Sequence, residues 1–392
     1  MSLRSFILSL IFLTPIVCMG QELDSLEQQR QDSLAITEAD DFVTVSVCVA
    51  SPGEETSSSL GHACLRLQCP SADLDYVYSY EAEDPTEDMF RFFTGKLKML
   101  VLAVPSEIYV AHYAQEGRGV EEYTLNLPVR VKKRLWQQMD KRLAYTPVPY
   151  DYLNRGCAVS VLQWLEDAIG KDSIDYASWP EKYNGSRADM AFDSITNEWS
   201  RFLLSTIVAG EVHKLNIDNT DKAILPTDLI EVLQGAKAFG EPILTEGNHH
   251  SLLAAKRSPR HAKVTPIMVA FVILFLSLLN LWPHNVWLRW AVLLPCLLIG
   301  TFVLCLVLFS SIPCTQWSVL VVPFCPLPFI FWKWRHWWAL PFALLCVAWI
   351  VGILLYPHRL VDGAHIVLAA AMALCNIEIY TKGNRYKLKI KK

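Results

Sequence analysis

The chain has 392 residues, of which 52% are hydrophobic and 19% are charged, and its net charge is -4. This length exceeds that of one average domain, and the slightly acidic balance excludes nucleic acid as the main partner. Charged residues are concentrated in the first two-thirds of the chain, and the last third is almost entirely apolar. The composition therefore predicts a soluble part followed by a membrane part.

The N-terminus has the pattern of a secretory signal peptide. Arg4 precedes an apolar run over residues 6–17, so we expect residues 1–20 to be a signal peptide. Residues 21–40 are polar without an apolar face and are expected to form a flexible leader. A lipidated Cys18 and an uncleaved anchor remain alternatives. In each case the domain that follows is exported.

Hydrophobic periodicity predicts an α+β domain at residues 41–170 and a helical extension and linker at 171–264. Alternation of apolar and polar residues predicts strands at 42–50, 61–67, 76–80, 98–104 and 121–127. Apolar residues at helical spacing predict helices at 105–113, 129–143, 157–169, 187–207 and 226–237.

The most informative position in the soluble part is Cys157. It opens the apolar-periodic segment 157–169, directly after Gly156, and Gly170 closes that segment. At the first turn of a helix, unpaired amide groups and the helix dipole favour a thiolate and can hold an oxyanion. Cys157 is therefore a candidate nucleophile, and the alternative is a small buried hydrophobic residue.

A thiol nucleophile needs a base, and His62 is the candidate. It stands at the start of a predicted strand, and histidine titrates in the required pH range. Ser79, Tyr78 and Glu81 on the next strand are candidates for a group that orients the imidazole. The alternative role for His62 is a hydrogen bond to a loop.

Three further residues are candidates for binding or orienting a substrate. Tyr150 and Asp151 precede the cysteine and are candidates to line the site, although an aromatic residue there is more often part of the core. Arg118 is a candidate for binding an anionic group, or for a structural ion pair with Glu116 or Glu121.

Neither a metal nor a cofactor is expected. His62, Cys64 and Cys69 lack the paired spacing of zinc ligands. Cys48 and Cys64 lie on strands expected to be neighbours, which makes them the expected disulfide pair, with Cys69 as an alternative partner. Two disulfides among the four soluble cysteines, or four unpaired thiols, remain alternatives. A catalytic Cys157 must remain a free thiol.

The last third of the chain predicts a transmembrane domain at residues 265–382 and a basic cytoplasmic tail at 383–392. Apolar segments of membrane-spanning length lie at about 265–282, 287–309, 316–332, 337–356 and 361–380. The third contains three prolines, and a re-entrant segment is an alternative there. His365 and Glu378 are ionisable residues within the last segment, Glu378 close enough to its end to be solvated.

Six motifs resemble, in the same order, the Lnb N-terminal periplasmic domain family. They are Ser51-Pro-Gly-Glu-Glu55, Leu60-Gly-His62-Ala-Cys-Leu-Arg66, Tyr76-Val-Tyr78-Ser-Tyr80, Phe93-Thr-Gly95, Glu116-Gly-Arg118, and Tyr150-Asp-Tyr-Leu153 followed by Cys157. The resemblance covers roughly residues 40–170. This family is named for a factor associated with secreted lacto-N-biosidase, is common in Bacteroidetes-type bacteria and is often fused to membrane helices.

The resemblance implies a permuted papain-like fold, similar to NlpC-type proteins, in which the histidine strand precedes the cysteine helix. It implies a thiol hydrolase or acyltransferase. Membrane tethering indicates amide or ester bonds of cell-envelope peptide or lipid as the substrate, and the signal peptide and basic tail indicate the inner membrane, with the N-terminal domain in the periplasm. The family usually has Asp-Asn before its cysteine, whereas this chain has Arg155-Gly156. A non-catalytic maturation or assembly factor for secreted glycosidases therefore remains the alternative.

Overall fold

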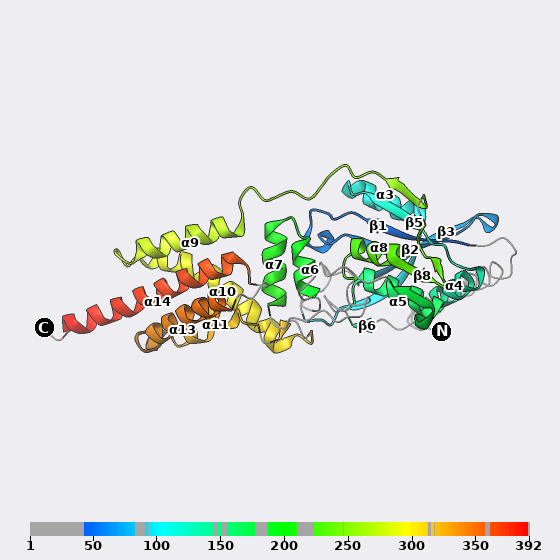
Figure 1. Ribbon diagram of the computed structural model, residues 1–392. Helices are drawn as coiled ribbons and strands as arrows, with labels where there is room; N and C mark the ends of the chain where they lie inside the picture. The colour runs from blue at the N-terminus through cyan, green and yellow to red at the C-terminus, as the bar shows by residue number, and fades with distance from the viewer. Residues whose placement is uncertain are drawn as a thin grey trace, which may run out of the picture.

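The computed structural model describes residues 43–82, 91, 94–143, 148–149, 155–176, 187–209, 223–245, 247–312, 315–316, 318–356 and 361–390. A β-rich N-terminal part and a helical C-terminal part lie end to end, as predicted, with α6 (Arg187–Asp193) and α7 (Glu198–Val208) between them (Figure 1). The predicted signal peptide and leader, and residues 150–151, lie outside the described residues.

An antiparallel seven-stranded sheet in the order β10-β5-β1-β2-β3-β4-β6 forms the centre of the β-rich part. Its strands are β1 (Thr44–Ala50), β2 (His62–Cys69), β3 (Leu74–Ala82), β4 (Lys98–Pro105), β5 (Val120–Thr124), β6 (Val148–Pro149) and β10 (His249–Leu253). A small second sheet contains β7 (Ile174–Tyr176), β8 (Ala236–Ala238) and β9 (Glu241–Pro242). The five predicted strands are confirmed. β10 was not predicted, because a short and mostly exposed edge strand has no period-two pattern.

The two faces of the large sheet are covered differently. Apolar side chains such as Leu65 and Leu67, both fully buried, pack against α4 (Val129–Leu143), α5 (Cys157–Ile169) and α8 (Pro226–Gly235). The opposite face, with Cys48 and Cys64, packs against α3 (Ser106–Glu116) (Figure 1). Burial of one leucine side chain contributes about 1.5–3 kcal/mol, so the α5 face carries most of the stability of this part.

Helix α5 begins at Cys157 and is followed by Gly170, as predicted. Ten of its 13 residues are buried, so packing fixes the position of its first residue. The prediction of a single helix at 187–207 is wrong, because the chain forms two helices there, α6 and α7. The side chain of Asn197 accepts hydrogen bonds from the amides of Trp199 and Ser200 and so caps a new helix start.

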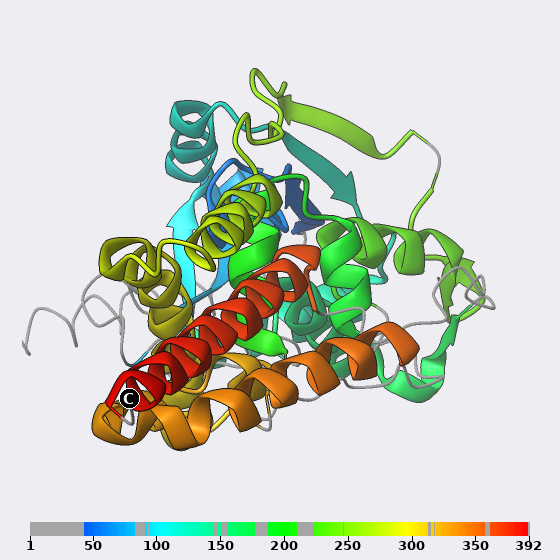
Figure 2. The same ribbon diagram turned by 90° about the vertical axis from the view of Figure 1, so that its left-hand side faces the viewer.

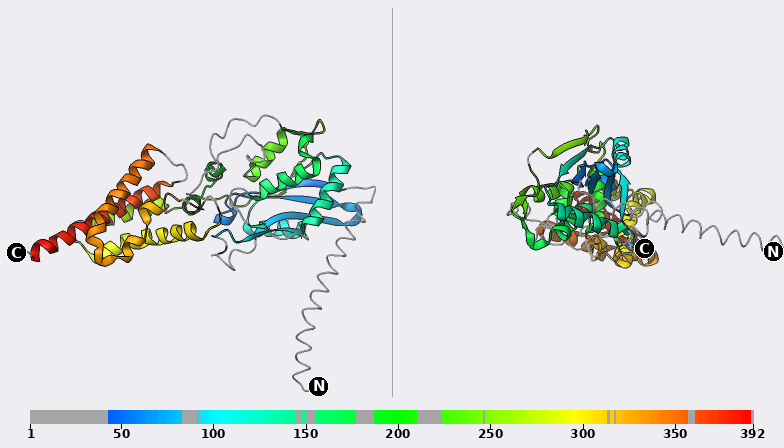
Figure 3. Two further views of the ribbon diagram at one scale, coloured as in Figure 1. Left: turned by 90° about the horizontal axis from the view of Figure 1, so that it is seen from below. Right: turned by 90° about the vertical axis from the view of Figure 1, so that its right-hand side faces the viewer.

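The C-terminal part consists of helices that extend away from the sheet, and the C-terminal end of α14 lies at the far tip (Figure 3). They are α9 (Pro266–Asn280), α10 (Val286–Phe309), α11 (Val321–Phe324), α12 (Leu327–Ile330), α13 (Arg335–Leu355) and α14 (Gly363–Ile390). Within the described residues, three helices are long and apolar enough to cross a membrane, at Val286–Phe309, Trp337–Leu355 and Gly363–Lys382. Helix α14 packs between α9 and α13 (Figure 2).

Several contacts join the two parts at the near end of the bundle. The amide of Ser311 donates to the carbonyl oxygen of Thr94 at 3.0 Å. On α14, the fully buried His365 contacts the Thr206 hydroxyl at 3.0 Å and stacks on Phe202 with ring centroids 4.4 Å apart. Helix α7 therefore links the bundle to the β-rich part.

Glu378, at the far end of the bundle, was expected to be solvated, but it is fully buried. Its carboxylate accepts two hydrogen bonds of 2.7 Å from Arg289, and the His284 Nδ1 lies 3.0 Å from it. Arg289 in the first turn of α10 supplies the counter-charge that allows this burial.

Candidate active site

The geometry at Cys157 is that of an uncapped helix start. The N-cap residue Gly156 has no side chain to accept from the first amides, and the first intrahelical bond joins the Ser160 amide to the Gly156 carbonyl at 3.0 Å. The amides of the first turn thus have no acceptor within the helix. A Cβ atom at Gly156 would meet no described atom within 4 Å.

The thiol of Cys157 and the imidazole of His62 lie close enough for each to shift the pKa of the other. Burial alone would raise the pKa of Cys157, but the His62 imidazolium and the Ala63 amide outweigh it and hold that pKa below its ordinary value. Burial alone would lower the pKa of His62, but the Cys157 thiolate and the Glu81 carboxylate hold it well above 6.5. The arrangement favours a thiolate–imidazolium pair.

The other side of the imidazole is held by β3. His62 Nε2 lies 2.7 Å from Ser79 Oγ and 3.2 Å from Glu81 Oε1, and the Ser79 hydroxyl donates to Glu81 at 2.5 Å. Strand register explains this: Cys64 is opposite Ser79, so the preceding residue on the same face, His62, lies beside Glu81. Nε2 is thereby engaged, which leaves Nδ1 for the thiol. The third candidate, Tyr78, faces the opposite core.

A pocket of about 430 Å³ lies between the end of the sheet and α3. Its lining residues are Ser57, Ser58, Gly61, His62, Ser79, Glu81, Leu102, Val104, Ile108, Tyr109, His112, Tyr113, Glu116 and Arg118. Cys157 is not among the described residues that line it. The pocket therefore borders the histidine side of the pair.

The remaining predicted site residues have different outcomes. Arg118 lines the pocket, and its Nη1 pairs with Glu116 at 2.9 Å, while Glu121 pairs with His249 on β10 instead. Tyr150 and Asp151 lie outside the described residues, so their predicted roles stay predictions.

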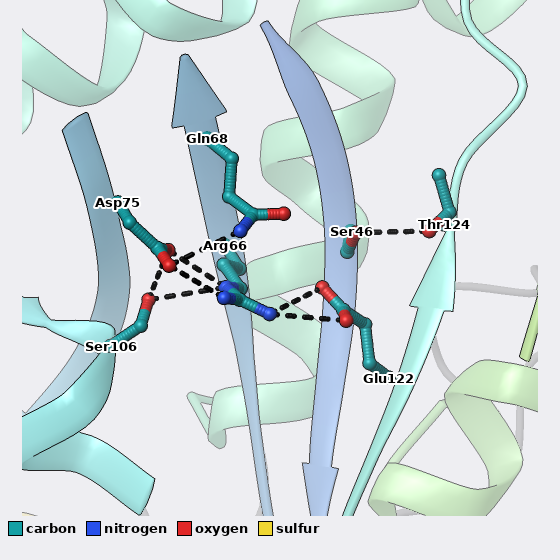
Figure 4. Close-up of polar contacts among 7 residues, drawn as sticks. All are labelled: Ser46, Arg66, Gln68, Asp75, Ser106, Glu122 and Thr124. Carbon is teal, nitrogen blue, oxygen red and sulfur yellow. Dashed lines mark hydrogen bonds and ion pairs between the residues drawn. The ribbon is translucent and has the colours of Figure 1, made fainter. Parts of the chain in front are cut away.

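A partly buried polar cluster centred on Arg66 was not predicted (Figure 4). The guanidinium donates two bonds to Asp75, at 2.8 and 2.6 Å, and two of 3.1 Å to Glu122. Ser106, the first residue of α3, donates to Asp75 as well. The cluster joins β2, β3 and β5 to the helix that forms one wall of the pocket. Arg66 lies on the same face of β2 as His62, so the alternation of that strand was the available signal.

The described cysteines are free thiols. Cys48 and Cys64 lie directly opposite each other in neighbouring strands, as predicted, but the expected disulfide is not formed. Within the described part of the chain, no three His, Cys, Asp or Glu residues are grouped to hold a metal ion.

The β-rich domain and the long apolar helices fit a membrane-anchored protein. Residues 31–183 match the family model of the Lnb N-terminal periplasmic domain, a range that includes both His62 and Cys157. The match and the helices together fit a membrane protein with a periplasmic N-terminal domain. No curated protein and no solved structure matches the chain.

Proposed function

We propose that this protein is a membrane-anchored, periplasm-facing thiol hydrolase or acyltransferase of permuted papain-like type. Cys157 is the nucleophile, His62 is the base, and Ser79 with Glu81 orients the imidazole. The observation that carries the proposal is the bridging position of His62 between the thiol and the Ser79–Glu81 pair. A thiol at the start of a helix that packs on an antiparallel sheet, with a histidine on one strand and its orienting group on the next, supports the papain-like assignment.

The chemistry follows from these positions. The Cys157 thiolate attacks the carbonyl carbon of an amide or ester, and the open amides at the start of α5 stabilise the oxyanion. The His62 imidazolium then gives its proton to the leaving amine or alcohol as the carbon–heteroatom bond breaks, which leaves a thioester on Cys157. Neutral His62 takes a proton from water, or from an acceptor alcohol or amine, and that nucleophile cleaves the thioester.

Membrane anchoring supports cell-envelope material, either peptide or lipid, as the substrate. One observation favours the alternative of a non-catalytic maturation factor for secreted glycosidases. Arg155 and Gly156 stand where the family usually has Asp-Asn before the cysteine.

A thiol-reactive activity probe applied to the full-length protein in membranes separates the two functions. We expect labelling that is lost in Cys157→Ser and strongly reduced in His62→Ala. Cys69→Ser, which changes another cysteine of the same domain, is the matched control and should label as the wild type. Labelling that persists in Cys157→Ser, or full biological complementation by both site variants, would favour the factor.

The membrane part is proposed to cross the inner membrane five times, with α11 and α12 together as the third, proline-broken crossing. Contacts to the β-rich part at Ser311 and His365 lie at the near end of the bundle, and the Arg289–Glu378 pair lies at the far end. This alternation supports a cytoplasmic position for the basic tail at 383–392, in agreement with the positive-inside rule.

The loop between α9 and α10 distinguishes five crossings from three. Trp282 in this loop is 91% exposed. A cysteine introduced by Trp282→Cys, in a background without other reactive thiols, should react with an impermeant reagent only from the cytoplasm. Reaction from the periplasm would mean that α9 does not cross. A reporter after Lys392 should be cytoplasmic, and one at residue 240 periplasmic.

A further inference from the structure

Residues 254–264, which we call the strap, connect the β-rich part to the first helix of the bundle. Figure 1 shows this segment leading from β10 past α7 to α9. Its first part is fixed beside the pocket, because the amides of Lys256 and Arg257 both donate to the carbonyl oxygen of Gly117 at 2.9 Å. Gly117 stands between Glu116 and Arg118, which line the pocket. The strap therefore begins at the rim of the pocket.

The other end of the strap is fixed to α7. The Glu198 carboxylate accepts a hydrogen bond of 2.7 Å from the Ala262 amide and lies 2.9 Å from the Nδ1 of His261. The Trp199 indole donates to the carbonyl oxygen of Val264 at 2.7 Å. Because both ends are held in this way, the side chains of the strap keep a defined place relative to the bundle.

The strap carries positive charge that the chain does not neutralise. Four basic side chains of the strap are exposed, namely Lys256, Arg257, Arg260 and Lys263. Within the described part of the chain, none of these four forms an ion pair. The sequence contains no Asp or Glu between Glu246 and Asp362. The carboxylate of Glu198 beside the strap already contacts His261 and an amide.

This charge is on the side of the membrane where the positive-inside rule expects few basic residues. The strap leads to the near end of the bundle, which is the periplasmic end in the proposed topology. Basic residues in a short translocated loop oppose the orientation that the basic tail favours. Orientation of the chain therefore does not explain the charge of the strap, and a local partner does.

Exposed apolar side chains surround the membrane end of the strap. Val264 is followed on α9 by Ile267 and Met268, and α7 adds Trp199 and Leu203; all five are exposed. Tryptophan is typical of the membrane–water interface, and lysine and arginine place their charged ends in the headgroup layer there. The combination of apolar and basic side chains indicates a lipid surface rather than a soluble acidic partner.

The chain geometry limits how far two of the basic residues can lie from the membrane. Thr265 is the N-cap of α9, and Lys263 and Arg260 precede it by two and five residues. At about 3.6 Å per residue, their backbones lie within about 7 and 18 Å of the start of this helix. Both side chains can therefore reach the headgroup layer, whereas Arg257 is held at the pocket rim.

We infer that the membrane end of the strap, with Arg260 and Lys263, binds the phosphate groups of anionic phospholipids in the periplasmic leaflet. The inference rests on the topology in the proposed function. An anionic headgroup supplies the counter-charge that these residues lack, and its acyl chains contact the exposed apolar side chains of α7 and α9. A zwitterionic headgroup brings its own cation and is attracted less. The strap then holds the pocket rim at a fixed height above the membrane.

The reactivity of Lys263 tests the inference on the full-length protein. The protein is placed in nanodiscs of phosphatidylcholine, with or without phosphatidylglycerol, and treated with the uncharged reagent N-acetoxysuccinimide. Mass spectrometry gives the acetylation rate of Lys263 relative to Lys237, an exposed residue of β8 that lies away from the bundle (Figure 1). An ammonium group paired with a phosphate keeps its proton and reacts slowly. We expect phosphatidylglycerol to lower the relative rate about fivefold, and high salt to restore it.

Two arginine variants locate the binding surface within the strap. Arg260→Gln removes one of the two charges at the membrane end, so the fall in the relative rate should shrink to about twofold. Arg257→Gln is the matched control, because it removes the same charge at the pocket end and keeps the aliphatic atoms that pack over Gly117. Its fall should equal that of the wild type.

Equal relative rates in the two kinds of nanodisc would overturn the lipid site, and so would a wild-type fall in Arg260→Gln. The topology is tested separately with the membrane-impermeant sulfonated form of the reagent. It should modify Lys263 in spheroplasts and not in inverted membrane vesicles. Modification in inverted vesicles alone would overturn the assignment to the periplasmic leaflet. Neither failure would bear on the proposed chemistry of Cys157, which the thiol probe tests.

Discussion

The charge of Glu81 controls the proton on His62, and Glu81→Gln isolates this effect. The carboxylate lies 3.2 Å from His62 Nε2 and accepts from Ser79. Glutamine has the same shape and keeps an acceptor oxygen, so the substitution removes the charge with little change in packing.

The size of the effect follows from the geometry. Two unit charges 3.2 Å apart attract by about 5 kcal/mol at an effective dielectric constant of about 20. Because the Glu81 side chain is 41% exposed, solvent screening reduces this to about 1–2 kcal/mol. That free energy corresponds to a displacement of about one pH unit in the titration of the imidazole.

The sign is determined by which form of each group is active. The alkaline limb of the pH profile reports loss of the His62 imidazolium, and Glu81 raises the pKa of His62, so Glu81→Gln moves this limb to lower pH. Glu81 also raises the pKa of Cys157, but this is the smallest of the effects on that pKa. In Glu81→Gln the acid limb therefore also moves to lower pH, by a smaller amount than the alkaline limb. The active window therefore narrows and shifts toward acid.

The assay is the second-order rate of inactivation of the full-length protein by iodoacetate across the pH range of both limbs. The His62 imidazolium attracts the carboxylate of this reagent, so the rate falls when the imidazolium loses its proton. Glu107→Gln, an exposed glutamate in the first turn of α3, is the control and should leave the profile unchanged. An alkaline limb that stays in place or moves to higher pH in Glu81→Gln would refute the assigned role of Glu81.

Three further substitutions test the framework of the site. Arg66→Met should destabilise the protein by about 3 kcal/mol in urea, because the Glu122 carboxylate, only 8% exposed, loses its partner. Adding Glu122→Gln should recover most of that loss, and no recovery would contradict the pairing. Burial would raise the pKa of Asp75, but Arg66 and Ser106 lower it, so its contribution to stability is lost as the pH falls through the folded value. Asp75→Asn should therefore flatten the decline of Tm below about pH 4, and an unchanged slope would refute this. In Gly61→Ala, a Cβ would lie 2.8 Å from the Ala50 carbonyl at a φ of +80°, which displaces His62. Thiol labelling should fall by about 10²-fold with an unchanged circular dichroism spectrum, and wild-type labelling would contradict the tight fit.

Much of the fold could be predicted because its periodicity is local. The strands that carry His62 and Ser79 alternate clearly, and α5 has an apolar stripe bounded by Gly156 and Gly170. The position of Cys157 at the first residue of α5 was predicted correctly, because the signals for a helix boundary lie in neighbouring residues of the chain. The choice between Ser79, Tyr78 and Glu81 could not be made, since it depends on strand register, which only pairing determines.

The partner of Arg118 was also beyond sequence analysis. Arg118 was a candidate for an ion pair or for an anion, and its Nη1 forms the ion pair with Glu116, while binding of an anion stays a prediction. Only the three-dimensional arrangement shows which of the two expected partners, Glu116 or Glu121, the guanidinium contacts. The burial of Glu378 was missed for the same reason, because its partner Arg289 is 89 residues away.

The membrane bundle and the pocket are connected through one helix. Ser57 and Ser58 belong to the short 3-10 helix Thr56–Ser58, which forms a wall of the pocket, and Thr56 is hydrogen-bonded to Ser200 on α7 at 3.1 Å. Helix α7 also contacts His365 of α14 through Thr206. The 3-10 helix Thr56–Ser58 is thereby held at the near end of the bundle, and Figure 1 shows that this end lies beside α7. In the proposed topology this end is the periplasmic membrane surface, so the pocket is held close to that surface. A substrate anchored in or lying along the envelope can then reach the pocket without detachment of the domain from the bundle.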